Sequence, residues 1–205
     1  MIDPDEALSR LQEGNARFVA GLHGREPGST DASRRIRLVG GQAPFAIVLG
    51  CSDSRVPAEI VFDQGLGDLF VIRVAGNIVA PSQIGSIEFA AERFGTRLVV
   101  VLGHSQCGAV QATLEELERP SEQRSPNLAA IVNRIRPAVA PLLETGAPHD
   151  DDLIEQAVRA NIQASVRQLR QGSPILEKLV SEGLRIVGAE YSLASGEVEF
   201  LETEP

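Results

Sequence analysis

Four short apolar runs stand out along the chain, and each is followed at once by glycine or a polar residue. The runs are Phe45–Leu49, Leu69–Ile72, Leu98–Leu102 and Leu184–Val187. They are continuous rather than alternating, which is typical of strands that are covered on both faces in a parallel sheet. The pattern therefore predicts a buried sheet built from these segments.

Segments with helical periodicity separate the apolar runs. Strands that alternate with helices make right-handed crossovers, so we expect a mostly parallel central sheet with helices on both faces. A last hairpin around Ser195-Gly196 adds an antiparallel edge strand. The sequence thus predicts a three-layer α/β fold. The expected helices are Ala58–Phe62, Gln83–Phe94, Ala109–Glu118 and a long stretch from Asn127 to Val180 broken at Pro137, Pro141 and Pro148; the hairpin strands are Ile186–Tyr191 and Val198–Leu201.

The N-terminal segment differs from this α/β pattern. Asp3 followed by Pro4 is a helix-start signal, with a capping side chain before a proline at the first helical position. A short basic helix is expected around Ser33–Val39. We therefore expect one domain over the whole chain, in which residues 1–40 form a helical arm and residues 41–205 form the α/β core.

Charge and composition narrow the classes of partner. The 205 residues carry a formal net charge of −9, so neither nucleic acid nor an anionic membrane is expected to bind. No apolar run approaches the roughly 20 residues that a membrane helix needs. The acidic N-terminus lacks the pattern of a secretory signal, and we expect a cytoplasmic protein. With two cysteines only, a disulfide framework is not expected.

Reactive side chains follow two of the predicted strands directly. Cys51-Ser-Asp53-Ser-Arg55 comes after the first apolar run, and His104-Ser-Gln-Cys107 comes after the third. Ligands of open α/β sheets bind at the carboxyl ends of the strands. If the two strands are neighbours, the two cysteines and the histidine converge on one point.

Two thiolates and one imidazole form a recognised catalytic zinc set, which leaves a fourth coordination position open. Soft ligands of this kind favour zinc over magnesium, calcium or manganese. A buried cysteine alone is usually only a small apolar residue, but here both cysteines of the chain and a histidine lie at matching strand ends. The glycine-rich segment 103–108 lacks the lysine of a phosphate-binding loop, and no Cys-x-x-Cys motif is present. We therefore expect one catalytic zinc ion, held by Cys51, His104 and Cys107.

Asp53 and Arg55 lie close to the first expected ligand. A pair of this kind is commonly a solvated turn contact of little energetic value. Beside a metal, however, the guanidinium of Arg55 would keep the carboxylate of Asp53 ionised and oriented. Asp53 could then accept a hydrogen bond from a zinc-bound water molecule.

The two reactive segments resemble the Cys-x-Asp-x-Arg and His-x-x-Cys-Gly motifs of the β-class carbonic anhydrases, and further similarity extends over most of residues 5–115. The resemblance implies zinc hydroxide attack on carbon dioxide, giving bicarbonate and a proton. It implies a homodimer or a dimer of dimers, with N-terminal helices packed across the partner and active sites at the interface. By position it assigns Cys51, His104 and Cys107 as zinc ligands, Asp53 and Arg55 as the catalytic dyad, and Gln42, Phe70, Phe89 and Gly108 as substrate-binding residues, with Phe89 at a position where many members have tyrosine.

Two alternatives to carbon dioxide hydration stay open from the sequence. A hydrolase of carbonyl sulfide or carbon disulfide could use the same zinc scaffold, because these substrates are linear analogues of carbon dioxide. A non-catalytic zinc or bicarbonate sensor could also retain the fold, although the presence of both Asp53 and Arg55 argues against it.

Overall fold

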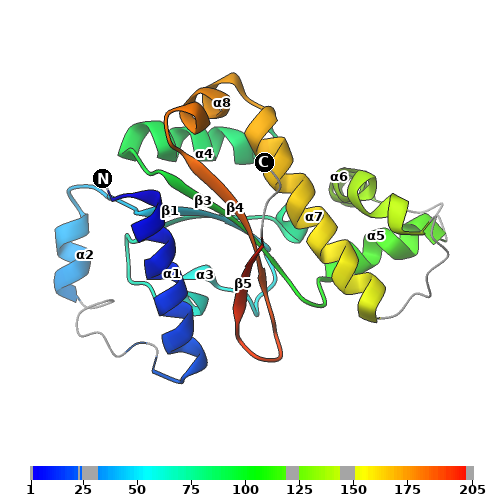
Figure 1. The fold of residues 1–205 in the computed structure, drawn as a ribbon, viewed down its shortest axis with the longest axis horizontal. Coiled ribbons are helices and arrows are strands. Elements are labelled where there is room, and N and C mark those ends of the chain that lie inside the picture. The colour runs from blue at the N-terminus through cyan, green and yellow to red at the C-terminus, as the bar shows by residue number, and fades with distance from the viewer. Residues whose placement is uncertain (1, 23, 25–31, 119–124, 144–150, 202–205) are drawn as a thin grey trace.

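A five-stranded sheet forms the centre of the computed structural model, which describes residues 2–22, 24, 32–118, 125–143 and 151–201. The strand order is β2-β1-β3-β4-β5, with β1 to β4 parallel and β5 antiparallel to β4 (Figure 1). This arrangement confirms the predicted sheet and its antiparallel edge. The strands are β1 (Ala46–Gly50), β2 (Leu69–Arg73), β3 (Leu98–His104), β4 (Arg185–Tyr191) and β5 (Val198–Leu201).

The continuous apolar runs are explained by burial of the sheet on both faces. Every residue of β1 and of β3 is buried. Ile47 and Leu49 point into one apolar core, while Val48 between them points into a second core on the opposite face. Because both faces are covered, no alternation of apolar and polar residues appears along these strands.

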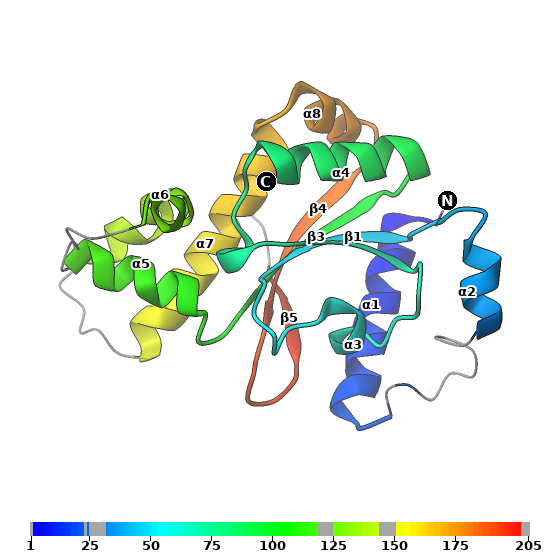
Figure 2. The same ribbon diagram turned by 180° about the vertical axis from the view of Figure 1, so that it is seen from behind.

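Helices that follow β2 along the chain cover the first of these faces, with α4 and α8 seen on one side of the sheet in Figure 2. They contribute most of the buried apolar side chains of the larger core. These elements are α4 (Pro81–Phe94), α5 (Gly108–Glu118), α6 (Pro126–Leu143), α7 (Asp151–Gln171) and α8 (Pro174–Ser181).

The expected helix breaks at Pro137 and Pro141 are wrong, because α6 continues through both residues. The two prolines are exposed, so the backbone carbonyls that lose their partners can be hydrated, and the buried face of α6 keeps the helix on the core. Among the described residues, α7 and α8 are separated at Ser173, which caps α8 by accepting a hydrogen bond from Leu176 N at 3.2 Å. The expected break at Pro148 lies outside the described residues.

The opposite face of the sheet is covered by α1 (Pro4–Val19) and α3 (Ala58–Val61). Asp3 caps α1, since its side chain accepts a hydrogen bond from Asp5 N at 2.8 Å, as the helix-start signal predicts. Gly14 lets α1 approach α3 closely: a Cβ at this position would lie 1.8 Å from the carbonyl oxygen of Phe62. The first helix therefore docks on the sheet through small and apolar residues.

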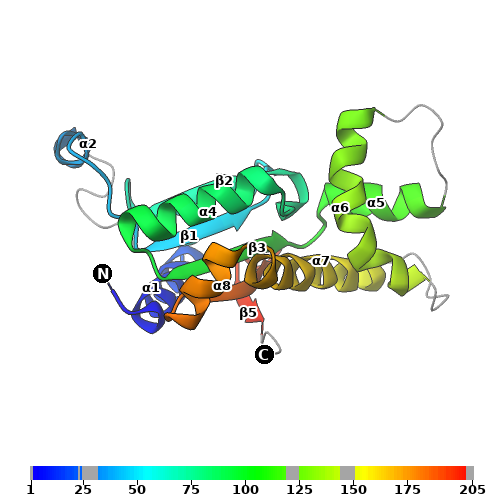
Figure 3. The same ribbon diagram turned by 90° about the horizontal axis from the view of Figure 1, so that it is seen from above.

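The basic helix α2 (Ala32–Leu38) lies at one end of the molecule, and α5 and α6 lie at the other (Figures 1 and 3). In the described part of the chain, no residue of α2 is buried. Ile36 of this helix is 73% exposed, and Val39, just after it, is 86% exposed. Within the described ranges, none of the helices is both long and apolar enough to cross a membrane.

Candidate metal centre

The two reactive segments meet because β1 and β3 are adjacent. Gly50 at the end of β1 pairs with Leu102 of β3, so the carboxyl ends of both strands lie at the same edge of the sheet. Cys51 directly follows β1, and His104 is the last residue of β3. Cys107 stands at the start of α5, where its carbonyl accepts hydrogen bonds from the next turn of the helix. The strand pairing thus brings together three residues that the sequence nominated as ligands.

The three potential ligand atoms form a tight, buried group. The sulfur atoms of Cys51 and Cys107 and a ring nitrogen of His104 all lie within 4.8 Å of one another, and all three side chains are buried. No other group of this kind is found among the residues that the structure describes. Such proximity is what a single metal ion requires of its ligands.

The hydrogen bonding of His104 leaves one ring nitrogen available. Its Nδ1 lies 2.9 Å from the carbonyl oxygen of Ser105, so this nitrogen carries the proton and donates it. Its Nε2 is buried and has no hydrogen-bond partner among the described residues. A buried, unpaired nitrogen costs free energy unless a ligand satisfies it. The second nitrogen is therefore placed to bind a metal ion.

The side chains of Cys51 and Cys107 are hydrogen-bonded to each other, which shifts the pKa values of the two thiols in opposite directions. A hydrogen bond from Cys107 lowers the pKa of Cys51 to about 4, although burial acts in the opposite direction. His104 and the backbone N–H groups of Asp53 and Gly76 lower this pKa further. The same contact with Cys51, together with burial, raises the pKa of Cys107 above its usual range. One thiolate is thus already stabilised beside a second thiol whose proton a cation would displace.

This donor set fits zinc on chemical grounds. Two sulfur ligands and one imidazole nitrogen suit a borderline-soft cation, and they do not suit the oxygen-seeking magnesium or calcium ions. Three protein ligands leave the fourth tetrahedral position for a reacting molecule. Cys51, His104 and Cys107 are therefore the residues that would hold a catalytic zinc ion.

Asp53 and Arg55 form a two-pronged ion pair at the edge of this group. Arg55 donates from Nε to Asp53 Oδ1 at 2.9 Å and from Nη2 to Oδ2 at 2.7 Å, and its backbone N–H also donates to Oδ1. The guanidinium of Arg55 holds the pKa of the Asp53 carboxyl well below its usual range. Oδ2 of Asp53 lies 3.8 Å from Nε2 of His104. An ionised, fixed carboxylate therefore lies beside the nitrogen that faces the thiols.

Sequence reasoning missed several residues that hold this loop in place. Arg73, at the end of β2, donates to the carbonyl oxygens of Cys51 at 2.9 Å and of Asp53 at 2.6 Å. Gln106 adopts a left-handed conformation with φ of 54° between His104 and Cys107, and its side chain donates to Asp151 at the start of α7. The position of Arg73 at the carboxyl edge of a parallel strand was a usable signal, but its backbone targets were not visible in the sequence.

Of the four expected substrate residues, Gly108 alone lies beside the cysteines in this chain. Gly108 follows Cys107 directly, is exposed and has open space around it. Phe70 lies on β2 opposite Ile47, which places it roughly 13 Å from Cys51 along the strand direction. It packs instead with Phe89 and Phe94, at ring distances of 6.3 and 6.2 Å. Phe89 is 53% exposed.

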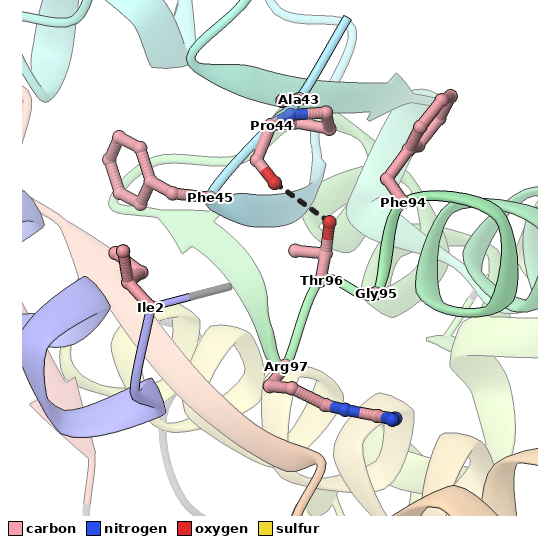
Figure 4. Close-up of a pocket in the computed structure, with 8 residues that line it drawn as sticks. All are labelled: Ile2, Ala43, Pro44, Phe45, Phe94, Gly95, Thr96 and Arg97. Atoms are coloured by element: carbon pink, nitrogen blue, oxygen red, sulfur yellow. Dashed lines mark hydrogen bonds between the residues drawn. The ribbon is translucent and has the colours of Figure 1, made fainter.

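Gln42 lies at the opposite edge of the sheet from the metal centre. It is exposed and precedes β1, whereas Cys51 follows that strand. The next residue lines a pocket of about 250 Å³ at this amino edge, where Thr96 donates to the carbonyl of Pro44 at 2.8 Å (Figure 4). The described residues around this pocket include no cysteine, histidine or carboxylate, so it offers no ligand set of its own; they are Ile2, Ala43, Pro44, Phe45, Phe94, Gly95, Thr96 and Arg97.

Comparisons with known proteins agree with the site. The family model described as carbonic anhydrase matches residues 46–198. A carbonic anhydrase of Mycolicibacterium smegmatis is 42% identical over 200 residues, which is 96% of this chain and 93% of that protein. Carbonic anhydrase 2 of Mycobacterium tuberculosis is 38% identical over 196 residues, covering 95% of this chain and 91% of that protein.

Solved structures show the same architecture. The β-carbonic anhydrase CafA of Aspergillus fumigatus superposes with a TM-score of 0.75 at 26% identity, covering 98% of this chain and 92% of that one. A tetrameric β-carbonic anhydrase of Sordaria macrospora shares the fold with a TM-score of 0.73 at 24% identity, covering 96% and 97% of the two chains. By its sequence motifs, its sheet and its relatives, this chain belongs to the β-class of the carbonic anhydrases, which are lyases.

Proposed function

We propose that this chain hydrates carbon dioxide reversibly with one zinc ion, held by Cys51, His104 and Cys107. One observation carries most weight: the buried Cys–His–Cys group lies beside the carboxylate of Asp53. The reaction is CO₂ + H₂O ⇌ HCO₃⁻ + H⁺. When bound, zinc would supply a Lewis acid that lowers the pKa of a water molecule and so generates the hydroxide nucleophile.

The Asp53–Arg55 pair would orient the reacting water. Held by Arg55 and ionised, Asp53 accepts a hydrogen bond from water but cannot donate one, so the oxygen lone pair turns toward the substrate. Arg73 fixes the same loop from behind through the carbonyl oxygens of Cys51 and Asp53. These contacts supply orientation before the substrate arrives, which is a large part of the catalytic effect in such sites.

The carbon dioxide pocket is proposed to form between two copies of the chain. Gln42, Phe70 and Phe89 lie away from the cysteines of their own chain, and Phe89 is exposed. Ile36 and Val39 are also apolar and exposed, as is typical of residues that become buried in a protein–protein interface. We therefore propose a homodimer or a dimer of dimers, in which Gln42, Phe70 and Phe89 serve the partner's metal centre. Gly108 would offer its backbone N–H to bicarbonate within its own chain.

Mixed dimers would test this arrangement. Gln42→Ala and Cys107→Ser homodimers should each be impaired in hydration. In a mixed dimer, the Gln42→Ala chain keeps its ligands and receives Gln42 from its partner, so one complete site is restored. Recovery of activity on co-expression supports a shared pocket, whereas no recovery shows that Gln42 acts within its own chain.

The decisive experiment for the activity is stopped-flow carbon dioxide hydration on metal-analysed protein. We expect about one zinc per chain and hydration that depends on it. Parallel rates on carbonyl sulfide test the hydrolase alternative, which no relative reported above favours. Metal-loaded protein that acts on neither substrate would leave only a sensing role. The expected cytoplasmic location is tested by cell fractionation.

A further inference from the structure

The turn after β2 brings a backbone amide onto the sulfur of Cys51. Gly76, in the short helical turn η1 (Ala75–Asn77), donates its N–H to Cys51 Sγ at 3.3 Å in a buried contact. A hydrogen bond of this kind withdraws charge from a thiolate and fixes its direction. Groups in the second shell of a metal tune its ligands in this way.

Only glycine fits this position. Gly76 has φ of 69° and ψ of 21°, a left-handed conformation that costs other residues free energy. A Cβ here would lie 2.7 Å from Cδ1 of Ile135 and 3.1 Å from Cβ of Ala109. The turn is therefore packed against α5 and α6 on one side, with its amide directed at the sulfur.

Helix α7 holds the same turn through two buried polar side chains. Asn161 donates from Nδ2 to the carbonyl oxygen of Gly76 at 2.8 Å, and Ser165 donates to the carbonyl oxygen of Asn77 at 3.3 Å. They lie one helical turn apart and are only 3% and 4% exposed. Burying an amide among apolar side chains is costly unless it is hydrogen-bonded. The bond to Gly76 thus accounts for a polar residue on the buried face of α7.

We propose that Asn161 is a positioning residue for the metal centre: by holding the carbonyl of Gly76, it keeps the Gly76 amide on the sulfur of Cys51. The proposal rests on the proposed function, since it takes Cys51 to be a zinc ligand. Through this contact, a residue of α7 would influence how strongly the thiolate of Cys51 donates electrons to the metal. The hydrogen bond that Asn161 donates goes to the carbonyl of Gly76 and not to a ligand atom.

The consequence is spectroscopic as well as chemical. Without Asn161 the turn loosens, and the sulfur of Cys51 keeps more negative charge. A more electron-rich thiolate is easier to oxidise, so the sulfur-to-metal charge-transfer band of a cobalt-substituted site moves to longer wavelength. The metal is also held less firmly, because the ligand is less fixed; second-shell changes typically cost 10- to 100-fold in metal affinity.

The test compares Asn161→Leu with a matched control, Asn15→Leu. Asn15 is also a buried asparagine that donates to backbone carbonyls, at 3.1 Å to Val61 and 2.9 Å to Gly196, but it lies on α1 at the other face of the sheet. Both variants should lose thermal stability. Only Asn161→Leu should shift the cobalt band and raise the zinc dissociation constant, by roughly 10- to 100-fold in a chelator competition.

A wild-type band and zinc affinity in Asn161→Leu would overturn the proposal, and so would an equal shift in both variants. Asn161→Ala, a smaller change with the same expected direction, serves if the leucine variant does not fold. Failure of the proposed zinc site shows separately, because wild-type protein would then bind neither zinc nor cobalt at one equivalent, and failure of the activity shows in the hydration rate of the metal-loaded wild-type protein. The readouts are affinity and spectrum, so they do not depend on activity.

Discussion

Nε2 of His104 lies 3.8 Å from the carboxylate oxygen Oδ2 of Asp53, although His104 ends β3 and Asp53 follows β1. The contact exists because β1 and β3 are neighbours and end at one edge of the sheet. A metal ligand and an ionised acceptor are thus set side by side by strand order. Each of the two can be altered separately, which separates metal binding from catalysis.

Cys107→Ser should abolish most zinc binding. A serine hydroxyl remains protonated at neutral pH and is a poor substitute for a thiolate ligand, so the tetrahedral set is lost. We expect about one zinc per chain in the wild-type protein and a small fraction of that in the variant, measured by elemental analysis after dialysis. Full occupancy in the variant would remove Cys107 from the site.

Asp53→Ala and Arg55→Ala should keep zinc and lose hydration. Loss of a positioned proton-handling group typically costs a factor on the order of 10² or more. Lys178→Ala removes an exposed cation from another ion pair, with Glu182 at 3.7 Å, and should leave the rate unchanged. Near-normal stopped-flow rates in either dyad variant would show that the pair is only a turn contact.

The sheet could be predicted from the sequence because its strands are buried on both faces. Burial on both faces produces uninterrupted apolar runs such as that of β3. The helix breaks were misplaced because proline propensity is a local rule. In α6 the packing of Val132, Ile135 and Val139 outweighs it, and both prolines face solvent.

The metal ligands could be nominated because cysteine and histidine carry their chemistry in the side chain. Their convergence still depended on strand order, which long-range pairing decides. Gly76, Arg73 and Asn161 were missed because they act on or through backbone atoms, and Asn161 lies 85 positions from the carbonyl that it binds. No local pattern encodes such a contact.

Gly14→Ala should destabilise the fold by forcing α1 away from α3. The new Cβ would lie 1.8 Å from a backbone oxygen that cannot move aside easily. We expect a loss of about 3 kcal/mol or more in the free energy of unfolding and a fall in the thermal midpoint of roughly 6–12 °C. Gly40→Ala, where nothing lies within 4 Å of the new Cβ, is the control and should change little.

Hydration should rise with pH and reach its plateau on the alkaline side of neutral. Two thiolates leave a zinc centre with a net charge near zero, so its water is acidified less than the pKa of about 7 in three-histidine enzymes. Titration of the Asp53 carboxyl does not account for this rise, because Arg55 holds the pKa of that carboxyl well below its usual range. Arg55→Ala should therefore lower the plateau without moving the midpoint of the stopped-flow profile. Fastest hydration in acid would contradict the hydroxide mechanism.

The last prediction concerns Glu190, a carboxyl that is only 7% exposed on β4. Burial raises the pKa of Glu190, and the negative charges of Glu155 and Glu199 raise it further. Arg159, 2.8 Å away, offsets this rise only in part. The folded state therefore holds this proton more tightly than the unfolded chain does. The resulting contribution to stability is complete below the unfolded pKa of about 4.3 and is lost as pH rises through the folded pKa.

Glu190→Gln removes this titration, so its free energy of unfolding relative to wild type should increase as pH rises from about 4.3 upward. The measurement is the difference in thermal midpoint between the two proteins at a series of pH values with zinc in excess. Glu199→Gln removes an exposed partner of the same arginine, at 2.5 Å, and should reduce the pH slope without abolishing it, because Glu190 itself still titrates. A Glu190→Gln difference that stays constant with pH would mean that burial does not govern the proton affinity of Glu190.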